Sequence, residues 1–132
     1  MRAVVDTKVW VSAFLTPGGA PASLLLAMFA SALVQVYSTA IEMEYRAVLA
    51  RTRFDIDPLA LAAFFGQLHG TGQQVDEAPE LAFNLPHPDD APFMALALYA
   101  GCPLVTGNAK HFPKALGVEV MTPREWLETR SG

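Results

Sequence analysis

The chain has few of the residues that would stabilise a fold covalently or give its surface a strong charge. Cys102 is its only cysteine, which excludes an internal disulfide and a multi-cysteine zinc site and suits a reducing cytoplasm. Charged residues make up 17% of the 132 positions, and the net charge is −4. This balance argues against a protein whose whole surface binds nucleic acid, but it permits a local basic patch beside an acidic site.

Long apolar runs are also missing. The longest, APASLLLAMFASALVQV, is shorter than the roughly 20 residues of a membrane span, and the chain opens with a predicted strand instead of a secretion signal. We therefore expect a soluble, cytoplasmic protein without membrane association. Because 52% of the residues are apolar, disorder is not expected, and residues 1–132 are predicted to form a single domain with a sizeable core.

Short runs rich in β-branched residues alternate with longer helical stretches. Strands are predicted over Ala3–Val5, Leu33–Tyr37, Leu104–Thr106 and Val118–Met121. Helices are predicted over Ala22–Ala32, Thr39–Arg51, Pro58–Leu68, Asp90–Ala100 and Pro123–Thr129. This alternation predicts an α/β fold with a central parallel sheet that is covered on both faces.

Several residue patterns predict where helices begin. Thr39 and Glu42 match a capping box, in which two side chains satisfy backbone N–H groups reciprocally, and Thr122 and Glu125 match a second one. Asp89 is the predicted N-cap of the helix over Asp90–Ala100. The proline-rich segment around it, EAPELAFNLPHPDDAP, is expected to be a surface connection and not a linker between domains.

Asp6 stands at the end of the first predicted strand, in the stretch MRAVVDTKVWVSAFL. In an open parallel sheet, ligands bind beyond the carboxyl ends of the strands, near the point where the strand order reverses. Aspartate at such a place is also a common N-cap of the helix that follows. Position alone leaves both explanations open.

Other carboxylates stand where helix capping does not require them. Glu44 borders the apolar stripe of its helix, and unlike Glu42 it is not explained by capping. Asp89 and Asp90 both open a helix, although one negative charge in the first turn would suffice. Asp6, Glu44 and Asp90 belong to three elements and could converge above the sheet. Their mutual repulsion would then require a hard divalent cation with oxygen ligands.

Four stretches taken together resemble the PIN domain, in the branch of VapC-like toxin components of toxin–antitoxin systems. They are VVDTKVWVSAF, EMEYRAVLAR, PDDAPFMALALYAGCPLVTGN and VEVMTPREWLE, and the resemblance runs from Met1 to about Leu127. It implies a three-layer α/β/α sandwich around a central parallel sheet. It also implies a ribonuclease that depends on Mg²⁺ or Mn²⁺ and hydrolyses phosphodiester bonds of RNA.

The acids of the family's pattern match Asp6, Glu44 and Asp90 in this chain, with Asp89 as the neighbour of the last. We expect Asp6 and Asp90 to be direct metal ligands, and Glu44 to act through a water molecule or as a base.

Further residues have predicted supporting roles around these acids. Thr7 and Thr106 could orient a carboxylate or a water molecule, or they could simply satisfy backbone groups at the end of a strand. Possible contacts to RNA phosphates are Lys8, Arg46, Lys110 and His111.

Two positions depart from the family's pattern. The family commonly has an acid where this chain has Asn108, and asparagine where it has Lys8. Since one negative charge is lost and one positive charge is gained, we expect one metal ion instead of two, bound weakly, and tighter binding after Lys8→Asn. The same departures leave open an alternative, in which the chain is a catalytically weakened PIN-like binding module.

Interaction partners are predicted from one apolar stretch and from the resemblance. Leu24–Phe29 exceeds what one small sheet face must cover, so a homodimer with a groove for a partner segment is expected, although ordinary core is the other explanation. The resemblance adds a cognate antitoxin protein, besides the RNA substrate.

Overall fold

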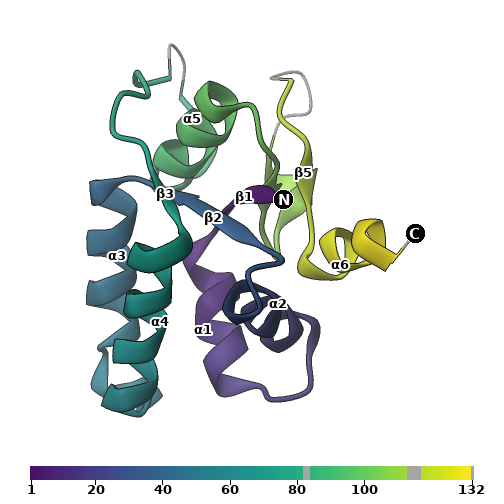
Figure 1. Ribbon diagram of the computed structural model, residues 1–132. Helices are drawn as coiled ribbons and strands as arrows, with labels where there is room; N and C mark the ends of the chain where they lie inside the picture. The colour runs from purple at the N-terminus through teal and green to yellow at the C-terminus, as the bar shows by residue number, and fades with distance from the viewer. Residues whose placement is uncertain (82–83, 113–116, 132) are drawn as a thin grey trace.

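The computed structural model describes residues 1–81, 84–112 and 117–131. In this part of the chain, five short parallel strands form a central sheet in the order β3-β2-β1-β4-β5 (Figure 1). They are β1 (Arg2–Val5), β2 (Val34–Tyr37), β3 (Gln73–Gln74), β4 (Leu104–Val105) and β5 (Val120–Met121). Because β2 and β3 lie on one side of β1, and β4 and β5 on the other, the strand order reverses between β1 and β4.

Helices cover both faces of the sheet, which confirms the predicted α/β/α sandwich. On one face, α5 (Ala91–Ala100) packs against β1, β2 and β4 and lies above the sheet in Figure 1. The other face carries α1 (Thr7–Leu15), α2 (Ala20–Phe29), α3 (Thr39–Leu49) and α4 (Pro58–Thr71), and α6 (Pro123–Ser131) packs beside α2. The connections contain the short 3₁₀ helices η1 (Thr52–Phe54), η2 (Pro88–Asp90) and η3 (Ala109–His111).

The helical layer below the sheet is packed around Phe64 of α4, which is fully buried. Trp10 of α1 meets its ring edge-on, with the ring centroids 5.3 Å apart, and Tyr45 of α3 does so at 6.1 Å. Ala3, Val4 and Val5 of β1 are completely buried, as expected of a strand that is covered on both faces. This packing fixes α1 and α3 relative to β1.

The predicted elements are present with shifts of a few residues at their ends, but helix α1 and one strand are not among the predicted ranges. The predicted helix Ala22–Ala32 corresponds to α2, which begins and ends slightly earlier, and the helix predicted from Pro58 continues to Thr71. β3 escapes prediction because it consists of two exposed glutamines.

The predicted helix starts agree only in part with those in the structure. The predicted capping box at α6 is present: the N–H of Thr122 donates to Glu125 Oε1 at 2.9 Å, and the N–H of Glu125 donates to Thr122 Oγ1 at 3.2 Å. The prediction for α5 is wrong by one residue. Asp90, not Asp89, occupies its N-cap, and the Asp90 side chain makes no capping hydrogen bond.

The start of α3 also differs from the prediction. Ser38, not Thr39, is its N-cap, and the Ser38 hydroxyl accepts a hydrogen bond from a backbone N–H of the first turn at 3.2 Å. Glu42 therefore has no capping role. Its Oε2 lies 2.8 Å from Arg46 Nε and 2.9 Å from His69 Nε2, so it joins α3 to α4.

Among the described residues, no single helix is long and apolar enough to cross a membrane. Helices α1 and α2 reach the required length and composition only as a pair, and that pair is bent by 99°. Each of them buries a large side chain in the protein core, Trp10 from α1 and Leu24 from α2.

Candidate active site

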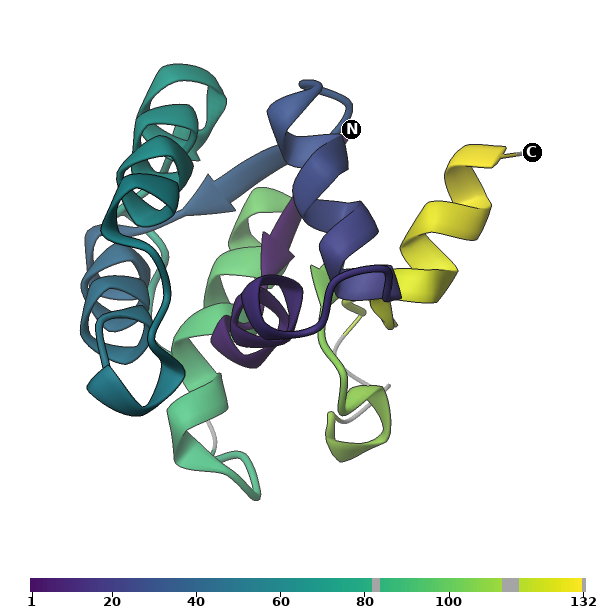
Figure 2. The ribbon, with the colours of Figure 1, turned by 90° about the horizontal axis from the view of Figure 1, so that it is seen from below.

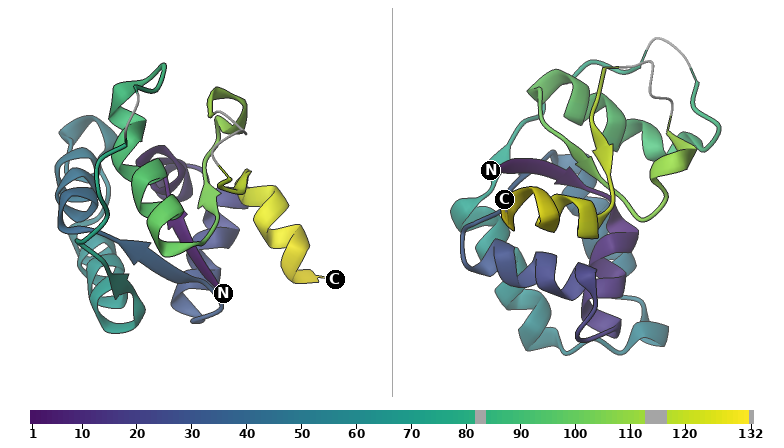
Figure 3. Two further views of the ribbon diagram at one scale, coloured as in Figure 1. Left: turned by 90° about the horizontal axis from the view of Figure 1, so that it is seen from above. Right: turned by 90° about the vertical axis from the view of Figure 1, so that its right-hand side faces the viewer.

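The carboxyl ends of β1 and β4 lie side by side at the point where the strand order reverses, with Val5 paired to Val105. Helix α1 begins directly after β1. The short helices η2 and η3 both project at the same edge of the sheet (Figures 2 and 3). Since ligands bind at this edge of open parallel sheets, the residues that follow β1 and β4 are the first candidates for a site.

Asp6 occupies the N-cap position of α1, but its side chain makes no capping hydrogen bond. The residue is 7% exposed, and its Oδ2 accepts a hydrogen bond from Thr106 Oγ1 at 2.9 Å. Thr106 follows β4 and is fully buried, and its hydroxyl oxygen accepts a hydrogen bond from the N–H of Asn108 at 3.2 Å. Capping therefore does not account for this buried carboxylate, which costs free energy to bury.

Glu44 lies in the middle of α3, at a half-buried position, and its carboxylate faces the start of α1. Thr7 is buried in the first turn of α1, and its hydroxyl donates a hydrogen bond to Glu44 Oε2. Thr7 and Thr106 therefore each hold one carboxylate at this edge of the sheet.

Asp90 ends η2 at a half-buried position directly before α5. Burial raises the pKa of its carboxyl group, and the negative charge of Asp6 raises it further, while His87 and Lys8 lower it. The negative charge of Asp6 thus disfavours the ionised form of Asp90. Asp89, the neighbour of Asp90, is exposed.

The carboxylates at this edge of the sheet supply part of what a divalent cation requires. In the described part of the chain, no group of three or more His, Cys, Asp and Glu side chains is arranged to hold a metal ion, so Glu44 does not join Asp6 and Asp90 in one group. The pair alone supplies hard oxygen donors whose repulsion a cation would relieve. Mg²⁺ is typically held by one or two carboxylates and keeps several waters, and the carboxylates of Asp6 and Asp90 are donors of this kind.

The chain matches a known protein family. The model of the family described as PIN domain matches residues 2–110, which include Asp6, Glu44 and Asp90. The chain belongs to the PIN domain family. It therefore has a nuclease-type fold, and PIN domains are generally nucleases that use divalent metal ions. No curated protein matches the chain in sequence.

The cationic residues that the sequence offers for RNA contacts have different surroundings in this PIN domain. Lys8 is exposed in the first turn of α1, and Lys110 is exposed in η3. Arg46 forms an ion pair within α3, and its guanidinium lies over the ring of Phe65 of α4, 4.0 Å from the ring centroid. His111 ends η3. Lys8 and Lys110 thus lie at the edge that carries the acids, whereas Arg46 packs between α3 and α4.

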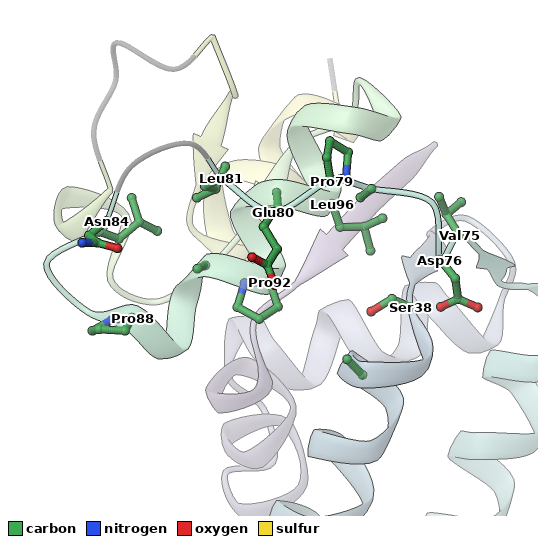
Figure 4. A pocket seen from close by; sticks show the side chains of 15 residues that line it. Ser38, Val75, Asp76, Pro79, Glu80, Leu81, Asn84, Pro88, Pro92 and Leu96 are labelled. Atoms are coloured by element: carbon green, nitrogen blue, oxygen red, sulfur yellow. The ribbon is translucent and has the colours of Figure 1, made fainter.

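A pocket of about 500 Å³ lies over α5 beside η2 (Figure 4). Its walls are mostly apolar and come from α5, the start of α3 and the segment between β3 and η2; they include Val75, Pro79, Leu81, Leu85, Pro92 and Leu96. Asp76 and Glu80 line it as well (Figure 4). The three acids of the candidate site are not among its lining residues, so the pocket is separate from that site.

Two buried polar residues of this PIN domain were not predicted as part of the site. Gln35 of β2 is 1% exposed, and Tyr45 of α3 is fully buried. In the sequence Tyr45 fits the apolar stripe of its helix and looks like ordinary core. Gln35 offers the one visible signal, since a glutamine between Val34 and Val36 interrupts a strand that is otherwise apolar.

Proposed function

We propose that this PIN domain is a divalent-metal-dependent endoribonuclease that hydrolyses phosphodiester bonds of single-stranded or loop RNA. The position of Asp6 is the observation that carries the proposal. Its carboxylate stands at an N-cap, leaves the helix uncapped, and is held by Thr106 in the neighbourhood of Asp90. Two carboxylates at the ligand-binding edge of a parallel sheet, one of which raises the pKa of the other, are typical of a functional site.

The residues present suggest a division of roles. Asp6 and Asp90 would hold Mg²⁺ or Mn²⁺; the chemistry that such an ion supplies when bound is the activation of water and the neutralisation of charge on the phosphoryl oxygens. Glu44, held by Thr7, is the candidate base that accepts a proton from the attacking water. Thr106 holds Asp6 in place.

Substrate binding is assigned to the exposed cations at this edge. Lys8 and Lys110 are solvent-exposed and can contact RNA phosphates, with His111 as a further candidate. Such contacts carry no base specificity, so they fit a protein that recognises the RNA backbone near the scissile bond.

We also propose that the protein is the toxin of a type II toxin–antitoxin pair, with a cognate antitoxin as its partner and a homodimer as its assembled form. The support is the resemblance of its four motif stretches to VapC-like proteins. A small neighbouring gene for a DNA-binding protein with a helical tail is the expected genomic context. An isolated gene without such a neighbour would contradict the toxin assignment while leaving the nuclease assignment intact.

Cleavage of a single-stranded RNA by the purified protein tests the nuclease proposal. We expect cleavage with Mg²⁺ or Mn²⁺, none with EDTA, and none for Asp6→Asn or Asp90→Asn at unchanged thermal stability. Asp57→Asn is the matched control, because Asp57 is an N-cap that does cap its helix, through the N–H of Leu59 at 2.9 Å, and asparagine caps equally well. Activity that survives both Asp6→Asn and Asp90→Asn would rule out the assignment.

A second candidate function is a binding module that has lost catalysis. Three observations favour it: Lys8 acts electrostatically on Asp90, Asn108 stands where the family commonly has an acid, and no three acids of the described residues form a metal-holding group. Such a module would bind RNA or a protein partner without cleaving RNA at any metal concentration. The same assay separates the two functions.

A further inference from the structure

A network of buried polar side chains from α1, β2 and α3 reaches the end of β1, next to the candidate site. Trp10 Nε1 donates a hydrogen bond to Gln35 Oε1 at 3.0 Å. Gln35 Nε2 donates to the hydroxyl of Tyr45 at 2.9 Å and to the carbonyl of Val36 at 3.1 Å. The Tyr45 hydroxyl in turn donates to the carbonyl of Val5, the residue before Asp6.

The Val5 carbonyl needs such a donor because of where it points. The N–H groups of Val4 and Asp6 both donate toward β4, at 2.9 Å each, to the carbonyls of Pro103 and Val105. Since the backbone groups of successive strand residues alternate in direction, the carbonyl of Val5 points toward β2.

On that side the backbone ladder stops early. The register pairs of β1 with β2 are Arg2 with Val34 and Ala3 with Gln35, whereas β1 pairs with β4 up to Val5. The Tyr45 hydroxyl therefore takes the place of a ladder hydrogen bond at the point where β1 separates from β2.

We propose that Tyr45 is a positioning residue of this nuclease, which fixes the end of β1 and thereby the backbone of Asp6. This inference rests on the proposed function. Tyr45 is also the chain neighbour of Glu44, so one buried side chain ties the helix of one acid to the strand of the other.

The chemistry of the site keeps Tyr45 in the form that this role requires. Burial raises the pKa of the Tyr45 phenol, and the negative charges of Asp6 and Glu44 raise it further. The phenol therefore stays protonated and remains a hydrogen-bond donor. A phenylalanine would fill nearly the same volume without burying a hydroxyl, so packing alone does not explain the tyrosine.

Tyr45→Phe tests the proposal, with Tyr37→Phe as the matched control. Tyr37 is a second buried tyrosine, 3% exposed on β2, and the centroid of its ring lies 6.4 Å from that of His69. For cleavage of a single-stranded RNA well below the unfolding temperature, we expect Tyr45→Phe to lower kcat about 10- to 100-fold and to leave KM within about twofold. Tyr37→Phe should change neither value.

Amide hydrogen exchange gives a readout that does not depend on activity. In Tyr45→Phe the Asp6 N–H, bonded to Val105, should exchange faster, while the Leu104 N–H, bonded to Glu119, keeps its protection. Gln35→Met, which removes the amide that orients the Tyr45 hydroxyl, should shift kcat and exchange in the same direction by less.

The outcomes separate this inference from the function on which it rests. An unchanged kcat in Tyr45→Phe, or an equal loss in Tyr37→Phe, would overturn the positioning role. If the wild-type protein cleaves no RNA, the proposed function fails instead, and unchanged exchange at Asp6 would then also exclude that Tyr45 fixes this backbone.

Discussion

Two aspartates at helix N-caps of this chain have different partners. Asp57 caps α4, because its Oδ1 accepts a hydrogen bond from the N–H of Leu59. Asp6 has the extended backbone of an N-cap, but its Oδ2 accepts from the hydroxyl of Thr106. Thr106 lies 100 residues further along the chain, so local sequence leaves both explanations of Asp6 open. The pairing of β1 with β4 brings Asp6 and Thr106 together, and this contact decides between the two explanations.

Lys8 is predicted to weaken metal binding at this site. It is exposed in the first turn of α1, and its charge lowers the pKa of Asp90, so it acts on one of the carboxylates that would hold the ion. Lys8→Asn removes a positive charge that competes with the cation, and we expect the affinity for Mn²⁺ to rise about fivefold by calorimetry.

A charge-matched control for Lys8→Asn is available on another helix. Arg124 is exposed in the first turn of α6, which lies apart from η2 (Figure 2). Arg124→Asn should leave the Mn²⁺ affinity unchanged. Equal Mn²⁺ affinities of the wild-type protein and Lys8→Asn would show that Lys8 is a surface residue without influence on metal binding.

At the scale of helices and strands, the sequence predicts a helix start correctly where the capping residues bind only each other. The box of Thr122 and Glu125 is present because both partners lie within one turn. The box of Thr39 and Glu42 fails because partners from elsewhere compete: Asp76 binds the N–H of Thr39 at 2.7 Å, and His69 of α4 binds Glu42. Such long-range partners are not visible in the sequence, which is also why Tyr45 looked like ordinary core.

Gly72, between α4 and β3, is predicted to be required by close packing of the backbone. A Cβ atom at this position would lie 2.3 Å from the carbonyl oxygen of Leu68 and 3.0 Å from that of Gln35. Because backbone atoms cannot move aside cheaply, Gly72→Ala should lower the free energy of unfolding by about 1–3 kcal/mol. Denaturant unfolding followed by circular dichroism measures this change.

Gly66, inside the helix that precedes Gly72, provides the control. A Cβ atom there would meet nothing within 4 Å, and the residue lies in the interior of α4. Gly66→Ala should therefore raise the free energy of unfolding by about 0.5–1 kcal/mol. A Gly72→Ala variant as stable as Gly66→Ala would refute the packing explanation.

At the scale of the whole molecule, the layered fold is predictable but the strand order is not. Alternating strand and helix periods indicate an α/β sandwich, since each period is a local property. The order β3-β2-β1-β4-β5 depends on which strands pair, and it is this order that brings the ends of β1 and β4 together. The sequence thus shows which acids helix capping does not explain. The pairing of β1 with β4 shows that Thr106 holds Asp6.

The predicted homodimer concerns α2, whose apolar stretch is divided between core and surface. Leu24 and Met28 are buried, whereas Leu26 is 70% and Phe29 is 41% exposed. If α2 lies in a dimer interface, Leu26→Lys should convert the protein to a monomer, as measured by light scattering at micromolar concentration. Leu59→Lys, on a side chain of α4 that is 79% exposed, is the control. A monomeric wild-type protein would contradict the prediction.

We propose that the Asp6 carboxylate belongs to a metal site and does not cap α1. Titration of Mn²⁺ into the wild-type protein, Asp6→Asn and Asp57→Asn, followed by calorimetry, tests it most directly. We predict that the wild-type protein and Asp57→Asn bind Mn²⁺ with equal affinity, and that Asp6→Asn loses binding while its unfolding midpoint is kept. Binding of Mn²⁺ to Asp6→Asn with the wild-type affinity would contradict the claim.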